Sequence, residues 1–119
     1  MLGAAMLLLG GSSNAITVSE AWDSPTGASP QVTAARTFTV PATNPGDVTL
    51  DIVLHSGGTL AYQKNSDPFV SFVDAEGASV ASGDTMRFRL TGAGESASVI
   101  VRDVLSAGAI APAFTITNT

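Results

Sequence analysis

Cysteine is absent from this 119-residue chain, and charged residues are scarce. The absence of cysteine excludes disulfide bonds, thiolate nucleophiles and cysteine-ligated zinc sites. Charged side chains make up 13% of the residues, well below the fraction of about a quarter that is usual. Because few charges would have to be desolvated, such a neutral surface packs readily against other proteins, which favours a role inside an assembly.

Basic residues are the scarcer of the two kinds of charge. Five lysines and arginines stand against ten acidic residues, and the net charge is −5. A protein that binds nucleic acid needs a basic stripe that displaces counterions from phosphates, so the composition argues against a nucleic-acid partner. Only Arg87 and Arg89 share one face of an expected strand, and we expect that face to be solvated.

No apolar run is long enough to cross a membrane. The run Met1–Gly10 has about half of the roughly 20 residues that a membrane-spanning helix needs, so we predict no membrane span. Ser13, Asn14 and Ala15 have the pattern of small residues at which a signal peptidase cleaves, but no lysine or arginine precedes the apolar run. Residues 1–15 are therefore either a retained extension, which we favour, or a signal peptide.

A retained apolar extension would have consequences for assembly. On a free monomer it would be an aggregation hazard, so we expect it to be buried against a neighbouring subunit. The chain then consists of an apolar N-terminal extension over residues 1–15 and one folded domain over residues 16–119. The expected interface residues are the large apolar ones of the extension: Met1, Leu2, Met6, Leu7, Leu8 and Leu9.

Alternation of apolar and polar residues, which is typical of strands, dominates the rest of the chain, and no segment there has helical periodicity. Residues 47–55 give the clearest example and end at the single histidine, His55, on the face expected to be exposed. The inward face of this strand is expected to carry Val48, Leu50, Ile52 and Leu54.

The stretch over residues 83–102 is expected to organise the fold. Met86, Phe88 and Leu90 alternate with polar residues, and a glycine-containing turn over residues 91–95 then leads into a β-branched run. Two such runs joined by a short loop with glycine are typical of a β-hairpin, so we predict a central antiparallel hairpin here.

Turn signals recur about every 8–12 residues, which predicts an all-β, two-sheet antiparallel sandwich, with a small barrel as the alternative. Residues 74–77 are one of the expected turns, and Phe114 and Ile116 are expected to face inward from the last strand. The patterns predict strands within residues 15–22, 31–40, 47–55, 59–64, 69–73, 78–81, 83–90, 96–102 and 113–117.

No group of residues carries recognisable chemistry. The only carboxylate at the spacing of the His55 strand face is Asp51, two strand steps away. No Gly-x-Ser-x-Gly elbow is present, and the acidic residues in turns lack the spacing of a calcium loop. We therefore predict a protein that is not an enzyme and that has no cofactor, no metal site and no catalytic residues.

Trp22, the only tryptophan, follows the first expected strand. One interpretation is an aromatic platform for a sugar or a protein partner. The other, which we favour, is a ring that packs in the core or at its rim, because a lone tryptophan beside a strand usually buries its ring.

Strand and turn motifs are spread over the stretches Trp22–Pro30, Thr33–Pro41, Ser79–Gly92, Ser98–Asp103 and Phe114–Ile116. Together they resemble the immunoglobulin-like β-sandwich domain of tailed-bacteriophage structural proteins. The resemblance implies an immunoglobulin-like antiparallel sandwich of about seven to nine strands. It further implies a virion role, as a capsid decoration or tail accessory protein, often as a homo-oligomer, and it brings no catalytic residue with it.

The expected function is therefore that of a non-enzymatic structural protein of a phage virion, docked by its apolar N-terminus onto capsid or tail subunits. The alternative is a secreted or cell-surface module that binds a carbohydrate, such as a host-surface glycan, or another surface. In that case residues 1–15 would be a signal peptide, and Trp22, Tyr62 or loop residues such as Asp67 would make the contacts. A small hydrolase is disfavoured for want of a site.

Overall fold

The computed structural model describes residues 15–119, which form eleven strands. This part of the chain contains no helix that could span a membrane. The strands are β2 (Thr17–Val18), β3 (Thr26–Gly27), β4 (Gln31–Val32), β5 (Arg36–Thr39), β6 (Asp47–His55), β7 (Thr59–Lys64), β8 (Val70–Phe72), β9 (Ala75–Ser79), β10 (Thr85–Thr91), β11 (Ser96–Asp103) and β12 (Phe114–Asn118). The expected interface residues Met1, Leu2, Met6, Leu7, Leu8 and Leu9 lie outside the described residues.

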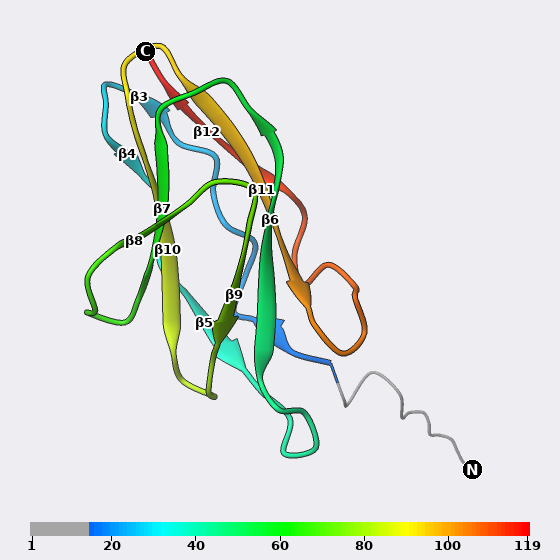
Figure 1. The fold of residues 1–119 in the computed structure, drawn as a ribbon. Helices are drawn as coiled ribbons and strands as arrows, with labels where there is room; N and C mark the ends of the chain where they lie inside the picture. Colours follow the sequence, from blue (N-terminus) through cyan, green and yellow to red (C-terminus); the bar gives the residue numbers. More distant parts are fainter. Residues whose placement is uncertain (1–14) are drawn as a thin grey trace.

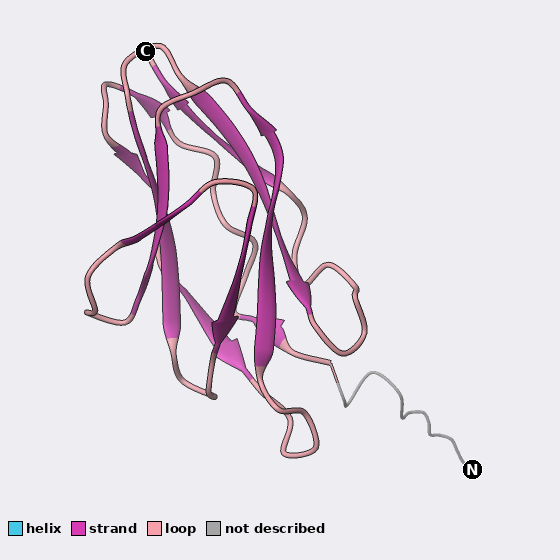
Figure 2. Cartoon of the chain, viewed as in Figure 1, coloured by secondary structure: helices cyan, strands magenta, loops and turns pink. Residues whose placement is uncertain are grey.

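The strands form two sheets packed face to face (Figures 1 and 2). One sheet has the order β2-β5-β10-β7-β8, with β4 also pairing with β10, and the other has the order β3-β12-β11-β6-β9. All pairs are antiparallel except β3 with β12, which is parallel. The all-β antiparallel sandwich is confirmed, and this arrangement is compatible with an immunoglobulin-like type.

Strands β10 and β11 do not form the hairpin that the sequence predicts. β10 pairs with β4, β5 and β7 in one sheet, whereas β11 pairs with β6 and β12 in the other. Residues 92–95 carry the chain across between the sheets, and Gly92 and Gly94 have φ angles of 130° and 76° that favour glycine. Phe88 and Val99 face the same core from opposite sheets, so alternation alone could not distinguish a crossing from a hairpin.

Strand β6 contains a bulge that reverses its alternation. The register with β11 skips Val53, and an extra residue of this kind sends the following side chains to the other face. Val48 and Leu50 are fully buried, as predicted, but Leu54 is 64% exposed. The prediction that Leu54 faces the core is therefore wrong.

The turn predicted over residues 74–77 is instead mostly strand. β9 begins at Ala75 and pairs with β6, with Glu76 opposite Leu50 and Ala78 opposite Val48. Because β6 buries Val48 and Leu50, the same register directs Glu76 and Ala78 toward the space between the sheets. Acidic and glycine residues are poor strand formers, and pairing with the long strand β6 outweighs that preference here.

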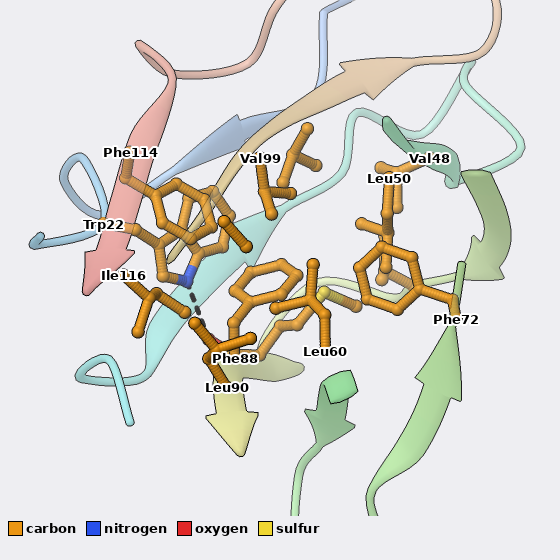
Figure 3. Packing of buried hydrophobic residues seen from close by; sticks show 14 of the residues in the cluster. Trp22, Val48, Leu50, Leu60, Phe72, Phe88, Leu90, Val99, Phe114 and Ile116 are labelled. Carbon is orange, nitrogen blue, oxygen red and sulfur yellow. Dashed lines mark hydrogen bonds between the residues drawn. The ribbon is translucent and has the colours of Figure 1, made fainter. Parts of the chain in front are cut away.

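Trp22 lies at the centre of the core and is 4% exposed. Its ring centroid lies 5.5 Å from that of Phe88 in one sheet and 5.7 Å from that of Phe114 in the other. The indole Nε1 donates a hydrogen bond of 3.0 Å to the Met86 carbonyl, as Figure 3 shows. The packing interpretation of Trp22 is confirmed, and its role as an exposed platform is wrong. Phe114 and Ile116 also face inward, as predicted.

The bulge in β6 predicts opposite outcomes for two leucines of one strand. Leu50→Ala should lower the free energy of unfolding by about 2–5 kcal/mol, because it leaves a cavity in the core. Leu54→Ala should change it by less than about 0.5 kcal/mol, because the side chain is mostly in solvent. Urea unfolding followed by Trp22 fluorescence measures both. Equal losses in the two variants would place Leu54 in the core and disprove the bulge.

Candidate functional site

A cleft opens between the free edges of the two sheets. β8 ends one sheet and β9 ends the other, and residues of both edges line a cavity of about 270 Å³. The lining residues are Tyr62, Lys64, Asp67, Pro68, Val70, Gly77, Ala78 and Ser79.

The side chains in this cleft continue the inward face of β7. Leu60 is buried in the core, and Tyr62 and Lys64 follow it at alternate positions, so all three point the same way. The Tyr62 ring packs edge-on against Phe72 at 6.0 Å. The Lys64 ammonium donates a hydrogen bond of 3.0 Å to the Ser79 carbonyl and so connects β7 of one sheet with the edge strand β9 of the other across the cleft. The apolar core therefore ends in a polar margin.

The cleft brings together groups that can donate and accept hydrogen bonds. Burial and the nearby Glu76 carboxylate raise the pKa of Tyr62 above its usual value, so the phenol is neutral at pH 7. A neutral phenol, an ammonium group and the Asp67 carboxylate offer donors and acceptors to a polar ligand beside apolar Val70.

His55 does not lie on the exposed face that the sequence predicts. After the bulge it pairs with buried Ala97, so its side chain is directed toward the inner face, and its Nε2 is buried without a hydrogen-bond partner. Asp47, at the other end of β6, is the residue that pairs with Ser79 of the cleft. His55 is thus remote from the cleft, and no metal-binding group of histidine and acidic residues occurs within residues 15–119.

A second polar site binds the backbone of Ile16, at the start of the sandwich. The buried carboxylate of Asp103 accepts hydrogen bonds from the Ile16 amide at 3.1 Å, the Asn44 side-chain amide at 3.1 Å and the Leu105 amide at 2.9 Å. Burial alone would raise the pKa of Asp103, but these bonds and one from the Ser106 amide outweigh it and lower the pKa below its usual value. We call Asp103, Ile16 and Asn44 the N-terminal clamp.

Apolar side chains are exposed directly beside the N-terminal clamp. Val104 and Leu105, which follow Asp103, are 50% and 63% exposed. The first described strand, β2, then pairs with β5, so the position of Ile16 is fixed on both sides. The end of the sandwich at which the chain enters therefore has an apolar rim.

The structure brings together some of the residues that the sequence marks as contacts and separates others. Tyr62 and Asp67 line one cleft, whereas Trp22 is buried in the core. Sequence analysis missed Lys64 and Asp103. Asp103 could have been found, because it occupies an inward position of an alternating strand where an apolar residue is expected.

Comparisons with known proteins add little to this geometry. No protein-family model matches the chain, and no curated protein matches it. Among solved structures, the chain is similar to the N-terminal domain of PorA, with 12% identity and a TM-score of 0.48. The match covers 87% of this chain and 96% of that one.

The N-terminal clamp predicts a loss of stability in acid. A carboxylate whose pKa is lower in the folded state stabilises that state above its unfolded pKa of about 3.9, and the gain disappears as the pH falls through the folded value. The pKa of Asp84 is also lowered, by hydrogen bonds from Asn65 and Ala81. We therefore expect the free energy of unfolding, measured by urea titration from pH 7 to pH 2, to fall below about pH 4.

Asp103→Asn tests the clamp itself. It should lower stability at pH 7 by about 1–3 kcal/mol and flatten the acid dependence, because buried amide donors lose a charged acceptor. The remaining slope should come in part from Asp84. Asp74→Asn is a matched change at an exposed turn and should alter stability at pH 7 by less than about 0.5 kcal/mol. An Asp103→Asn protein with wild-type stability and slope would contradict the clamp.

Proposed function

We propose that this protein is a non-enzymatic structural module of a particle, such as a capsid decoration or tail accessory protein of a phage virion, docked through its apolar N-terminal segment. The observation that carries the proposal is the N-terminal clamp beside an apolar rim. Asp103 fixes Ile16 at one end of the sandwich, and Val104 and Leu105 expose apolar surface at the same place. In the proposed docking, a partner would contact this rim as well as the apolar residues that precede Ile16 in the sequence.

The clamp would fix the position of the whole domain relative to a docked N-terminal segment. Because the Ile16 amide is held by a buried carboxylate and β2 is paired, a partner that holds the preceding segment would also hold the sandwich at a defined end. The C-terminus lies at the opposite end of the molecule (Figure 1). Docking at the clamp end would leave that far end accessible.

The outer face of the sheet that contains β6, β11 and β12 supports close packing against neighbours. Its side chains include a hydrogen-bonded pair, Ser98 with Thr115, and an ion pair of 2.8 Å between Arg102 and Asp51. The hydroxyl groups are hydrogen-bonded to each other and the two charges are paired. Burial of this face against another protein would therefore leave little charge without a partner. Such a surface suits contact with other virion subunits or with copies of the same chain.

Removal of the apolar segment tests the docking role. A chain without residues 1–11 should keep the stability of the sandwich but fail to incorporate into particles, because the core cluster is built from side chains between Ile16 and Ile116. Urea unfolding and co-sedimentation with assembled particles give the two readouts.

A matched control is Val73→Ser, which makes an apolar residue that is 73% exposed polar, away from the clamp and from the face that contains β11, and which should leave incorporation unchanged. The clamp-end variant Leu105→Ser should reduce incorporation without unfolding the domain. Normal incorporation of the truncated chain would refute docking through the N-terminus.

The second candidate function is glycan binding, and the cleft favours it. Tyr62, Lys64 and Asp67 converge there with hydrogen-bonding groups beside apolar surface, as a sugar-binding site requires. This function goes with a secreted or cell-surface protein, for which the mature chain would begin at Ile16.

Two measurements address this candidate. Intact-mass analysis of the protein from its native source should show a chain that begins at Ile16 for export, and at Met1 or Leu2 for assembly. In a glycan-array experiment, Asp67→Asn should weaken binding about tenfold if the carboxylate accepts a sugar hydroxyl. Thr39→Ala, an exposed polar change away from the cleft, is the control. A wild-type array without any bound glycan would eliminate this candidate.

A further inference from the structure

Two arginines lie over one phenylalanine on the outer face of the sheet that contains β10. The guanidinium carbon of Arg89 lies 4.1 Å from the centroid of the Phe69 ring, and that of Arg87 lies 5.4 Å from it. We infer that this arginine cluster, made of Phe69, Arg87 and Arg89, binds an oxyanion, and that its ligand is the carboxylate or sulfate group of an acidic sugar.

Neither guanidinium of the cluster has an anionic partner in the described part of the chain. Arg102 pairs with Asp51, and Arg36 lies within 4.0 Å of Glu20 and Asp23. No carboxylate of residues 15–119 comes that close to Arg87 or Arg89. The chain has twice as many acidic residues as basic ones, so a shortage of carboxylates does not explain the difference.

The cluster is held in place before any ligand arrives. The Arg87 Nε donates to the side-chain carbonyl of Gln63, which leaves its two terminal nitrogens without a protein acceptor. Gln63 in turn donates to the Asp67 carbonyl at 3.0 Å and so braces the loop that carries Phe69. Asn65, with a φ of 56°, closes the same loop. A ligand would therefore meet two guanidinium groups whose orientation is already restricted.

Partial burial of Arg89 strengthens the binding of an anion to its guanidinium group. Its Nε is shielded from solvent and has no hydrogen-bond partner. The face of the Phe69 ring stabilises the cation only in part, since a cation–π contact is worth about 0.5–2 kcal/mol. Charge attraction is stronger where water is excluded, so an oxyanion on the terminal nitrogens would be bound more firmly than at a solvated arginine.

The surroundings of the arginine cluster indicate which class of molecule would supply the oxyanion. The planar guanidinium fork matches carboxylate, sulfate and phosphate groups. The net charge of −5 repels a densely charged polyanion such as nucleic acid. We therefore expect a ligand that carries few negative charges. Thr91 on β10 and Thr59 opposite it add exposed hydroxyl groups on the same face. Hydroxyl groups beside an anion-binding pair suit an acidic sugar.

Titration of the isotope-labelled full chain with inorganic sulfate, glucuronate and glucose tests the inference. The Nε–H signals of Arg87 and Arg89 in nitrogen–proton correlation spectra report directly on the cluster. We expect saturable shifts of both signals with sulfate and glucuronate, stronger binding of glucuronate, and no shifts with glucose. Equal binding of sulfate and glucuronate would indicate an adventitious ion only and would overturn the sugar assignment.

Two variants that each remove one positive charge distinguish binding at the cluster from an effect of the protein's net charge. Arg89→Gln should weaken glucuronate binding about tenfold, as expected for loss of a charge-assisted hydrogen bond. Arg102→Gln removes the same charge from the other sheet and should leave binding unchanged. Phe69→Leu keeps the charges but removes the ring, and it should weaken binding several-fold, because it frees the guanidinium groups.

Unaltered amide spectra away from the cluster would show that these variants are folded, since none of the three side chains belongs to the main core. Two results would overturn the inference. One is the absence of saturable shifts in the wild-type protein. The other is an equal loss of binding in Arg89→Gln and Arg102→Gln.

Discussion

The packing of Trp22 between the two sheets is the interaction on which the rest of the structure depends. Its ring contacts Phe88 from one sheet and Phe114 from the other, and those two rings also approach each other to 4.9 Å. Aromatic rings of this size bury large areas, and the indole N–H is satisfied by the Met86 carbonyl. Because the chain has no disulfide, this contact and the aliphatic side chains around it must hold the sheets together. The polar sites lie where this core ends.

The margins of the core account for the positions of both polar sites. Along β7 the inward row passes from buried Leu60 to Tyr62 and Lys64, and there the gap between the sheets becomes a cleft. Along β11 the inward row ends at Asp103, whose carboxylate stays ionised because amide groups surround it. In each case a strand extends beyond the end of the apolar core. Its last inward side chains are polar and partly shielded from water, so their interactions are stronger than in bulk water.

Alternation in the sequence was sufficient to predict most of the strands and most of the core, because a period of two fixes the faces of each strand, but β3 and most of β9 lie where the sequence predicts a loop and a turn. It could not predict partners. The β10–β11 connection has the composition of a hairpin, yet the strands belong to different sheets, and only the packing of both inward faces on one core decides this. The bulge at Val53 has no local signature either, so Leu54 and His55 were assigned to the wrong faces. The cleft was beyond prediction, because Tyr62 and Ser79 meet only through the fold.

The two outer faces of the sandwich differ in how their charge is balanced, and this difference bears on how the domain would sit in an assembly. On the face that contains β11, Arg102 is neutralised by Asp51, and hydroxyl groups bond to one another. On the face that contains β10, Arg87 and Arg89 have no carboxylate partner within residues 15–119. Burying the second face against a neutral protein would leave two cations without counter-charge, which is far more costly than burying a neutralised face. In the proposed assembly, the domain would therefore pack through its neutralised face and its N-terminal end, which would leave the arginine cluster accessible from solvent.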